Sequence, residues 1–283
     1  MSSAAAPQLP PDAYEDRSAT VIGVVAFCLF FATSMVGARI YTRACLIHQL
    51  GIDDYFCVFS LFVVYGCGIA IAHMTYYGLG KHIYVMDPED IPLYLRDFYV
   101  SIVFYTSSLM VIKLTFLFQY YRVLAVQNMR NIYIAAIIIV GAWGLSQALI
   151  GIFICTPISG FWDSTIKATC IPDLPQWYIN AAGNIITDIA VFVLPLPAIW
   201  NLNLARPQKL LLLGIFSLGF FTVVISMIRI RFLKLFEDFP WENVEPSCWS
   251  MGELTSAITC ACLPTLRPFV SRYFPGLGSL IGR

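Results

Sequence analysis

The chain has 283 residues, of which 59% are hydrophobic and only 12% are charged, with a formal net charge of zero. Soluble domains carry roughly 25% charged residues, so this composition excludes a water-soluble globule. The balanced charge and the lack of a basic face give no indication of nucleic-acid binding.

Seven apolar stretches are each long enough to cross a bilayer, which takes about 20 helical residues. The sequence therefore predicts an all-α membrane fold, a seven-transmembrane helix bundle in which short connections make neighbouring helices antiparallel. The predicted spans are residues 19–38, 53–74, 98–119, 132–154, 178–200, 210–230 and 248–268. The corresponding domains are a disordered N-terminal segment (1–18), the seven-helix membrane domain (19–270) and a short tail (271–283).

Loop charges predict the orientation, because Lys and Arg are retained on the cytosolic side. The side with the connections after spans one, three and five carries nine Lys and Arg residues, and the other side carries seven. The bias is clearest at the first span, which Arg39 and Arg43 follow and Arg17 precedes. We expect an outer N-terminus and a cytosolic C-terminus in a multi-pass protein of the plasma membrane or an endomembrane. The inverted topology is the alternative.

Three cysteines fall at the predicted outer face, which is oxidising in the secretory pathway. We predict a disulfide between Cys155 and Cys170 that closes the intervening loop on itself, with Cys248 as a competing partner. Three free thiols are the alternative. No cysteine and histidine spacing typical of a metal site is present, so we predict none.

Two adjacent acids, Asp53 and Asp54, open the second predicted span. Acids at a helix N-terminus are favoured by the helix dipole, which is sufficient reason for them to be there. The functional alternative is an inner ionic network with Arg122, Arg206 or Arg267 that distinguishes a resting state from an active one.

Ionisable groups in the spans are the main candidates for a site, because each costs about 2.5–3.5 kcal/mol at a helix centre on insertion scales. Lys113, Asp188 and Glu253 are such groups. Asn180, Asn184 and Asp188 recur every four residues and so share one face of the fifth helix. Because a polar face avoids lipid, we expect it to face the bundle interior.

Arg229, Glu253 and His73 are predicted to complete, with the asparagines and Asp188, a polar ligand site that opens toward the outside. The alternatives are structural. Asp188 then only pairs with Lys113 or with hydroxyl groups to set helix register, Glu253 only neutralises Arg229, and His73 is a satisfied interhelical histidine.

An ordered set of motifs carries a family resemblance. The motifs are Arg39 and Arg43 before Asp53-Asp54, Gly78-Leu79-Gly80-Lys81-His82, Lys113 with Tyr121 and Arg122, Cys155-x-Pro157 with Trp162 and Cys170, Asp188 with Pro195, Arg229, and Glu253 with Leu266-Arg267-Pro268. Over about residues 20–270 the chain resembles the fungal rhodopsin-domain family of seven-helix integral membrane proteins. This family includes plant-pathogenicity receptor-like proteins and members from secondary-metabolite gene clusters. The resemblance implies a seven-helix bundle and a receptor-like role.

Retinal requires a Schiff-base lysine, usually in the seventh helix, and the segment from Met251 to Phe269 contains none, so we expect no retinal and no other cofactor. The first hypothesis is a receptor-like protein that binds a small, apolar ligand from the outer side. Its expected partners are membrane lipid and a cytosolic signalling protein. The second hypothesis is a cyclase-like intramembrane enzyme of a fungal secondary-metabolite pathway, with Asp188 and Glu253 as candidate general acids. A transporter is a third option, but paired broken repeats are not evident.

Overall fold

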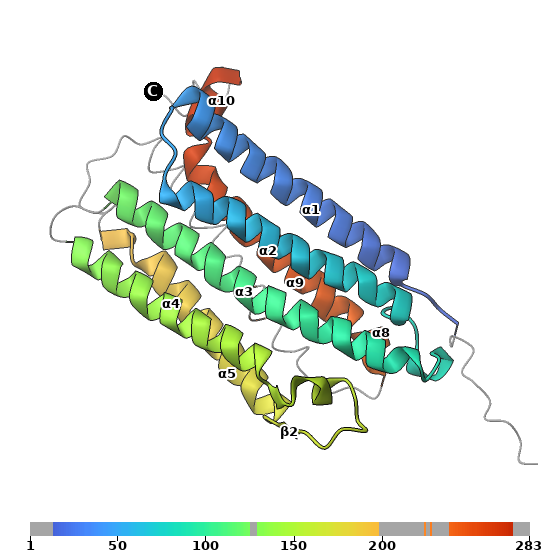
Figure 1. Cartoon of the computed structure of the whole chain (residues 1–283). Coiled ribbons are helices and arrows are strands. Elements are labelled where there is room, and N and C mark those ends of the chain that lie inside the picture. The colour runs from blue at the N-terminus through green and yellow to red at the C-terminus, as the bar shows by residue number, and fades with distance from the viewer. Residues whose placement is uncertain (1–13, 125–128, 198–223, 225–226, 228–237, 274–283) are drawn as a thin grey trace, which may run out of the picture.

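Long helices lying side by side make up most of the computed structural model, which describes residues 14–124, 129–197, 224, 227 and 238–273 (Figure 1). The long helices are α1 (Ser18–Tyr41), α2 (Ile52–Met74), α3 (Asp90–Leu124), α4 (Arg130–Ile152), α5 (Asp173–Val193) and α9 (Val244–Cys262). The short elements are η1 (Thr42–Leu46), η2 (Thr75–Tyr77), η3 (Ile83–Val85), β1 (Cys155–Thr156), η4 (Ile158–Phe161), β2 (Thr169–Cys170), α8 (Phe239–Glu242), η5 (Leu263–Thr265) and α10 (Arg267–Tyr273).

Four described segments are long and apolar enough to cross a membrane, which confirms a helical membrane fold in coarse terms. They are Ser18–Leu46, Ile52–Tyr77, Asp90–Val123 and Arg130–Ile152. The fifth and seventh predicted spans correspond to α5 and the more polar α9. The sixth predicted span, 210–230, lies outside the described residues except for Val224 and Met227, which are helical.

Several predicted helix ends differ from those of the structure. The third helix runs from Asp90 to Leu124 instead of 98–119, because its charged ends find partners and stay helical beyond the apolar stretch. The fifth helix ends at Val193, ahead of a turn at Pro195, and the seventh ends at Cys262, ahead of Pro264. Proline lacks the backbone N–H that a continuing helix needs, which accounts for both early ends.

The bundle has two distinct ends. The helices α1, α3, α5 and α9 begin at what we call the N-terminal end, and α2 and α4 run the opposite way (Figure 1). Backbone hydrogen bonds from Arg17 N–H to Gly80 O (2.9 Å) and from Gly80 N–H to Pro240 O (3.1 Å) tie three segments together at this end. Gly80 has a φ of +95°, which glycine adopts without strain, and an added Cβ would lie 2.8 Å from the Ser18 nitrogen. The helix α10 lies at the opposite, C-terminal end.

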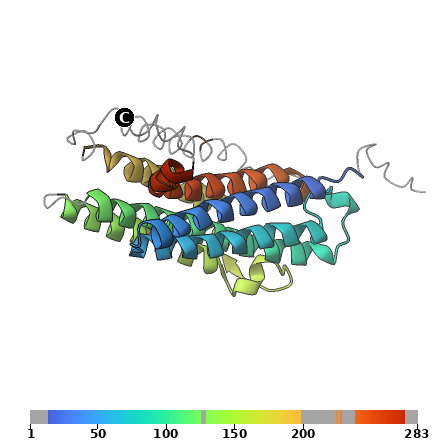
Figure 2. The ribbon, with the colours of Figure 1, turned by 90° about the horizontal axis from the view of Figure 1, so that it is seen from above.

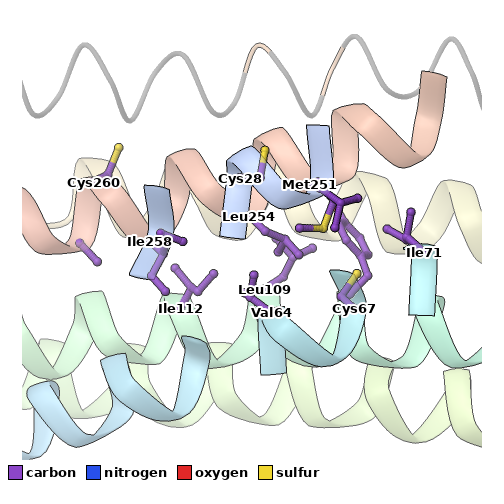
Figure 3. Packing of buried hydrophobic residues seen from close by; sticks show 14 of the residues in the cluster. Cys28, Val64, Cys67, Ile71, Leu109, Ile112, Met251, Leu254, Ile258 and Cys260 are labelled. Atoms are coloured by element: carbon purple, nitrogen blue, oxygen red, sulfur yellow. The ribbon is translucent and has the colours of Figure 1, made fainter. Parts of the chain in front are cut away.

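The apolar core lies where α1, α2, α3 and α9 meet, and Figure 2 shows α1 and α9 side by side along the bundle. Side chains from these helices interdigitate in Figure 3, with buried cysteines such as Cys67 and Cys260 packed as small apolar groups. Large apolar side chains also cover the outside, where Phe30 is 73% and Phe27 is 67% exposed. A surface of this kind is stable in lipid.

The connection between α4 and α5 is closed by the predicted disulfide. The strands β1 and β2 pair antiparallel with Cys155 opposite Cys170, and the two cysteines are bonded. The pairing prediction is confirmed, and Cys248 is a free, half-buried thiol. Within the loop, the Thr165 hydroxyl donates to Asp163 Oδ1 (2.6 Å), and this hydrogen bond holds the pKa of Asp163 below its usual value.

Removing this crosslink with Cys155→Ser/Cys170→Ser is expected to lower the free energy of unfolding by about 3 kcal/mol, because an untethered loop of about 15 residues gains that much entropy when it unfolds. The measurement is unfolding of the detergent-solubilised protein by SDS titration. Cys248→Ser is the control and should leave the transition unchanged. Equal shifts for the two variants would contradict the assigned role of the crosslink.

Candidate functional site

A central polar cluster connects α3, α5 and α9 inside the apolar bundle. We define it as Tyr105, Lys113, Asn184, Thr187, Asp188 and Glu253. Asn184, Thr187 and Asp188 are three and four residues apart and therefore share one face of α5, as the sequence predicts for Asn184 and Asp188. This face lies against α3, so the predicted polar stripe does turn inward.

The ammonium group of Lys113 is the centre of the cluster. Its Nζ donates to the Asn184 carbonyl oxygen (2.9 Å), to Asn184 Oδ1 (2.5 Å) and to Thr187 Oγ1 (2.6 Å). It also lies 3.1 Å from Asp188 Oδ1 in an ion pair. An ammonium has three N–H donors, and α5 alone supplies acceptors for all of them. The pairing of Lys113 with Asp188, one of the alternatives for these residues, is present.

A second group of bonds extends the cluster to α9. Tyr105 Oη donates to Glu253 Oε2 (2.6 Å), and Asn184 Nδ2 donates to Glu253 Oε1 (3.3 Å). Glu253 is 2% exposed, and both of its partners are also buried. Asn184 is therefore the link between the ion pair and the Glu253 carboxylate, whose two oxygens accept hydrogen bonds from α3 and α5.

A small cavity lies beside the cluster between α3, α4 and α5. It has a volume of about 20 Å³, and its polar lining comes from Thr106, Lys113, Gln147, Asn180, Asn184 and Thr187. This volume holds about one water molecule, whereas pockets for organic ligands are typically about 300–1,000 Å³. A larger ligand can enter here only if α4 or α5 moves away from α3.

The structure places His73, another predicted site residue, away from the central polar cluster. His73 lies in the last turn of α2, where its Nδ1 is 2.5 Å from Asp97 Oδ2 and its ring is 5.2 Å from that of Tyr77. Its side chain is 49% exposed and has no contact with the central polar cluster among the described interactions. Arg229 lies outside the described residues.

The C-terminal ionic network is a second polar group, centred on Arg39, Asp53 and Asp54. Arg39 is completely buried, and it donates to Asp54 Oδ1 (2.8 Å) and Asp53 Oδ2 (2.6 Å). Its Nη1 also donates to Gln119 Oε1 (2.9 Å) and to the Ala261 carbonyl oxygen (2.6 Å). One side chain therefore joins α1 to α2, α3 and α9.

The predicted contact between the acids and Arg122 is also present. Arg122 Nη1 donates to Asp53 Oδ1 (2.9 Å), and its Nη2 donates to the Gln49 carbonyl oxygen (2.8 Å). The Gly51 N–H donates to Asp54 Oδ2 (3.0 Å), so the helix-terminus interpretation holds as well. Arg206 and the side chain of Arg267 lie outside the described residues.

Sequence reasoning missed Arg39 as the central partner. The first span was predicted to end at residue 38, which made Arg39 a loop charge, but α1 continues to Tyr41. Arg39 and Arg43 are four residues apart and therefore lie on one helical face, just before two acids. That spacing was the available signal.

Comparisons with known proteins agree with the fold. The sequence profile described as fungal rhodopsin domain matches residues 38–272. The SAT4 family membrane protein of Emericella nidulans is 26% identical over 73% of this chain and 54% of its own length, so the chain matches about half of that relative. Receptor GIN3 of Arthrobotrys oligospora is 25% identical over 98% of this chain and 69% of its own length. The polyenoic acids biosynthesis gene cluster protein Ba17b of Metarhizium anisopliae is 24% identical over 88% of this chain and 73% of its own length.

Proposed function

Since this chain belongs to the fungal rhodopsin domain family, we propose that it is a seven-helix, receptor-like membrane protein with its N-terminus outside and its C-terminus in the cytosol. It binds a small, apolar molecule from the outer side. Four described candidate spans and the receptor name of one relative support this proposal. The arginines at the C-terminal end of the bundle, Arg39, Arg43, Arg122 and Arg130, support the orientation.

The central polar cluster is the observation that carries the proposal. A buried polar network is costly in an apolar surrounding unless every member is hydrogen-bonded. A ligand that replaces one hydrogen bond of the cluster therefore changes the relative stability of the helix arrangements that the cluster holds together. A ligand group at Asn184 competes with both Lys113 and Glu253. The result is a shift of α5 against α3 and α9.

The helices α3 and α9 transmit this shift from the central polar cluster to the C-terminal end of the bundle. Glu253 and Ala261 are both on α9, and eight residues separate them by about 12 Å along the helix. Ala261 accepts a hydrogen bond from Arg39, and Gln119 of α3 accepts another. Movement of α9 therefore alters the C-terminal ionic network, and a cytosolic signalling partner binds at this end of the bundle and responds to the alteration.

Asp188→Asn tests this function. The purified protein is screened with a library of small apolar molecules for compounds that raise its unfolding temperature. For any such compound we expect the variant to bind at least about tenfold more weakly. The substitution removes the charge of Asp188 that pairs with Lys113, which in turn bonds to Asn184 at the proposed ligand site. A hydrogen bond to a charged group is worth about 1.5–3 kcal/mol. Ser108→Ala is the matched control, since its buried hydroxyl bonds only to Phe104 O of its own helix among the described contacts. Equal binding by Asp188→Asn and wild type would reject the site.

An intramembrane enzyme is the second candidate. The name of the Metarhizium anisopliae relative places that protein with a biosynthesis gene cluster. This chain has a buried carboxyl group, Glu253, and a half-buried one, Asp188, in the bundle. A buried carboxyl group acting as a general acid is a recognised route for protonating an apolar substrate. Chemical conversion of a stabilising compound by membranes containing the protein, and its loss in Asp188→Asn, would support this candidate over the receptor.

A further inference from the structure

We propose that an anionic phospholipid of the inner leaflet binds an apolar groove between α2, α3 and α4, with its acyl chain in the groove and its phosphate at Arg122 and Arg130. Only the choice of leaflet depends on the orientation proposed above. The groove has a volume of about 440 Å³. It is lined by Ile52, Asp53, Phe118, Tyr121, Arg122, Ile134, Ile137 and Ile138.

The position of the groove favours an acyl chain as its occupant. All three helices are candidate membrane spans. The lining residues Ile52 and Ile138 are 63% and 64% exposed, so the groove opens onto the outer surface of the bundle. That surface faces hydrocarbon when the helices span a bilayer. A volume of this size matches that of a typical site for an apolar ligand.

Two arginines give the groove a cationic mouth. The Arg122 side chain is 28% exposed where it borders the groove. Arg130 is also exposed, and its Nε donates to the hydroxyl of Tyr121 (2.8 Å), which lines the groove. A guanidinium has five N–H donors, and this is the one hydrogen bond that Arg130 makes among the described residues. Donors remain for a phosphate beside the place where the acyl chain lies.

The C-terminal ionic network also has an excess of positive charge. Arg39, Arg43 and Arg122 supply three positive charges, and Asp53 and Asp54 supply two negative ones. Arg43 Nε is buried and has no hydrogen-bond partner among the described residues. An anionic head group compensates this excess charge. A zwitterionic lipid does not, because it has no net charge. Basic sites at the cytosolic ends of transmembrane helices bind anionic head groups for this reason.

The lipid also acts on the contacts of α2. Arg122 holds Asp53 at the start of this helix, and a phosphate at Arg122 competes with that carboxylate. The bound lipid therefore adjusts the C-terminal ionic network from the membrane side. A free phosphate ion would reach the arginines but would not fill the apolar groove.

Photocrosslinking tests the proposal. The full chain is placed in phosphatidylcholine nanodiscs. One sample contains a small fraction of phosphatidylserine with a diazirine on one acyl chain, and the other contains the same fraction of phosphatidylcholine with the same label. We expect phosphatidylserine adducts in peptides that contain residues 118–122 and 130–138, and stronger labelling than with phosphatidylcholine. Arg130→Gln should reduce this preference about fivefold, since one cationic residue near the surface contributes about 1 kcal/mol. Arg96→Gln is the control, because Arg96 is an exposed arginine at the N-terminal end of the bundle, and this variant should keep the preference.

A second pair of variants tests the groove itself. Ile138→Trp fills the groove and should remove most adducts, whereas Ile139→Trp should not, because Ile139 is equally exposed (66%) but does not line the groove. Equal labelling by the two lipids, or adducts that persist in Ile138→Trp, would overturn the proposal. Labelling that only a free fatty acid can displace would reject the phospholipid as the occupant.

Discussion

Replacing Arg39 with methionine is expected to lower the free energy of unfolding by about 3–5 kcal/mol, the usual cost of removing one partner from a buried ion pair. Arg39 is fully buried and bonds to both Asp53 and Asp54, which are each 1% exposed. Without Arg39, two adjacent carboxylates remain buried and their negative charges are only partly neutralised. Unfolding by SDS titration, together with the yield of monodisperse protein in detergent, measures the loss.

Two further variants separate this effect from a general sensitivity to arginine loss. Arg43→Met should cost much less, because its nitrogens are 3.8–3.9 Å from the same carboxylates, too far for good hydrogen bonds. The triple variant Arg39→Met/Asp53→Asn/Asp54→Asn should recover much of the stability, since it removes the buried charges together. If Arg39→Met and Arg43→Met lose the same stability, Arg39 is not the centre of the network.

Lys113→Met is expected to cost about 3 kcal/mol for the same reason. The substitution removes the donor to Asn184 and Thr187 and leaves Asp188 without its cation in the middle of the bundle. Lys113→Met/Asp188→Leu should recover part of the loss, and the double-mutant cycle should give a coupling of at least about 1 kcal/mol. The same SDS titration provides all four values.

Thr115→Val is the control for Lys113→Met, because the buried hydroxyl of Thr115 bonds only to Val111 O of its own helix among the described contacts. Its expected cost is below about 1 kcal/mol, the typical net value of one neutral hydrogen bond. Independent, additive effects of Lys113→Met and Asp188→Leu would show that the ion pair contributes nothing to stability.

The ends of α3 show where hydropathy stops being informative. The apolar stretch predicts where a helix crosses the membrane, because transfer into lipid depends on the side chains of that stretch alone. The helix itself continues through Asp97 at one end and Arg122 at the other, and both residues bond to α2. Those partners come from another part of the chain, so a window on α3 does not contain them.

The choice of ionic partners shows the same limit. Asp53 and Asp54 were expected to meet an arginine, and three arginines were named as candidates. The structure confirms Arg122 as a partner and adds the buried Arg39, since the predicted span ended at residue 38, one residue before it. Charge and spacing restrict the candidates, but only the rotation and depth of α1 against α2 select among them.

The amino-acid sequence by itself predicted the helical membrane fold and the inward polar face of α5, and it favoured the Cys155–Cys170 crosslink over a pairing with Cys248, which the structure then confirmed. Each depends on properties of one segment: its transfer free energy, its helical period or the redox chemistry of its compartment. The tertiary structure alone decided that Lys113 and Glu253 meet on Asn184 and that His73 lies with Asp97 instead. Contacts between helices depend on their relative rotation and depth, which the summed packing of the whole bundle sets.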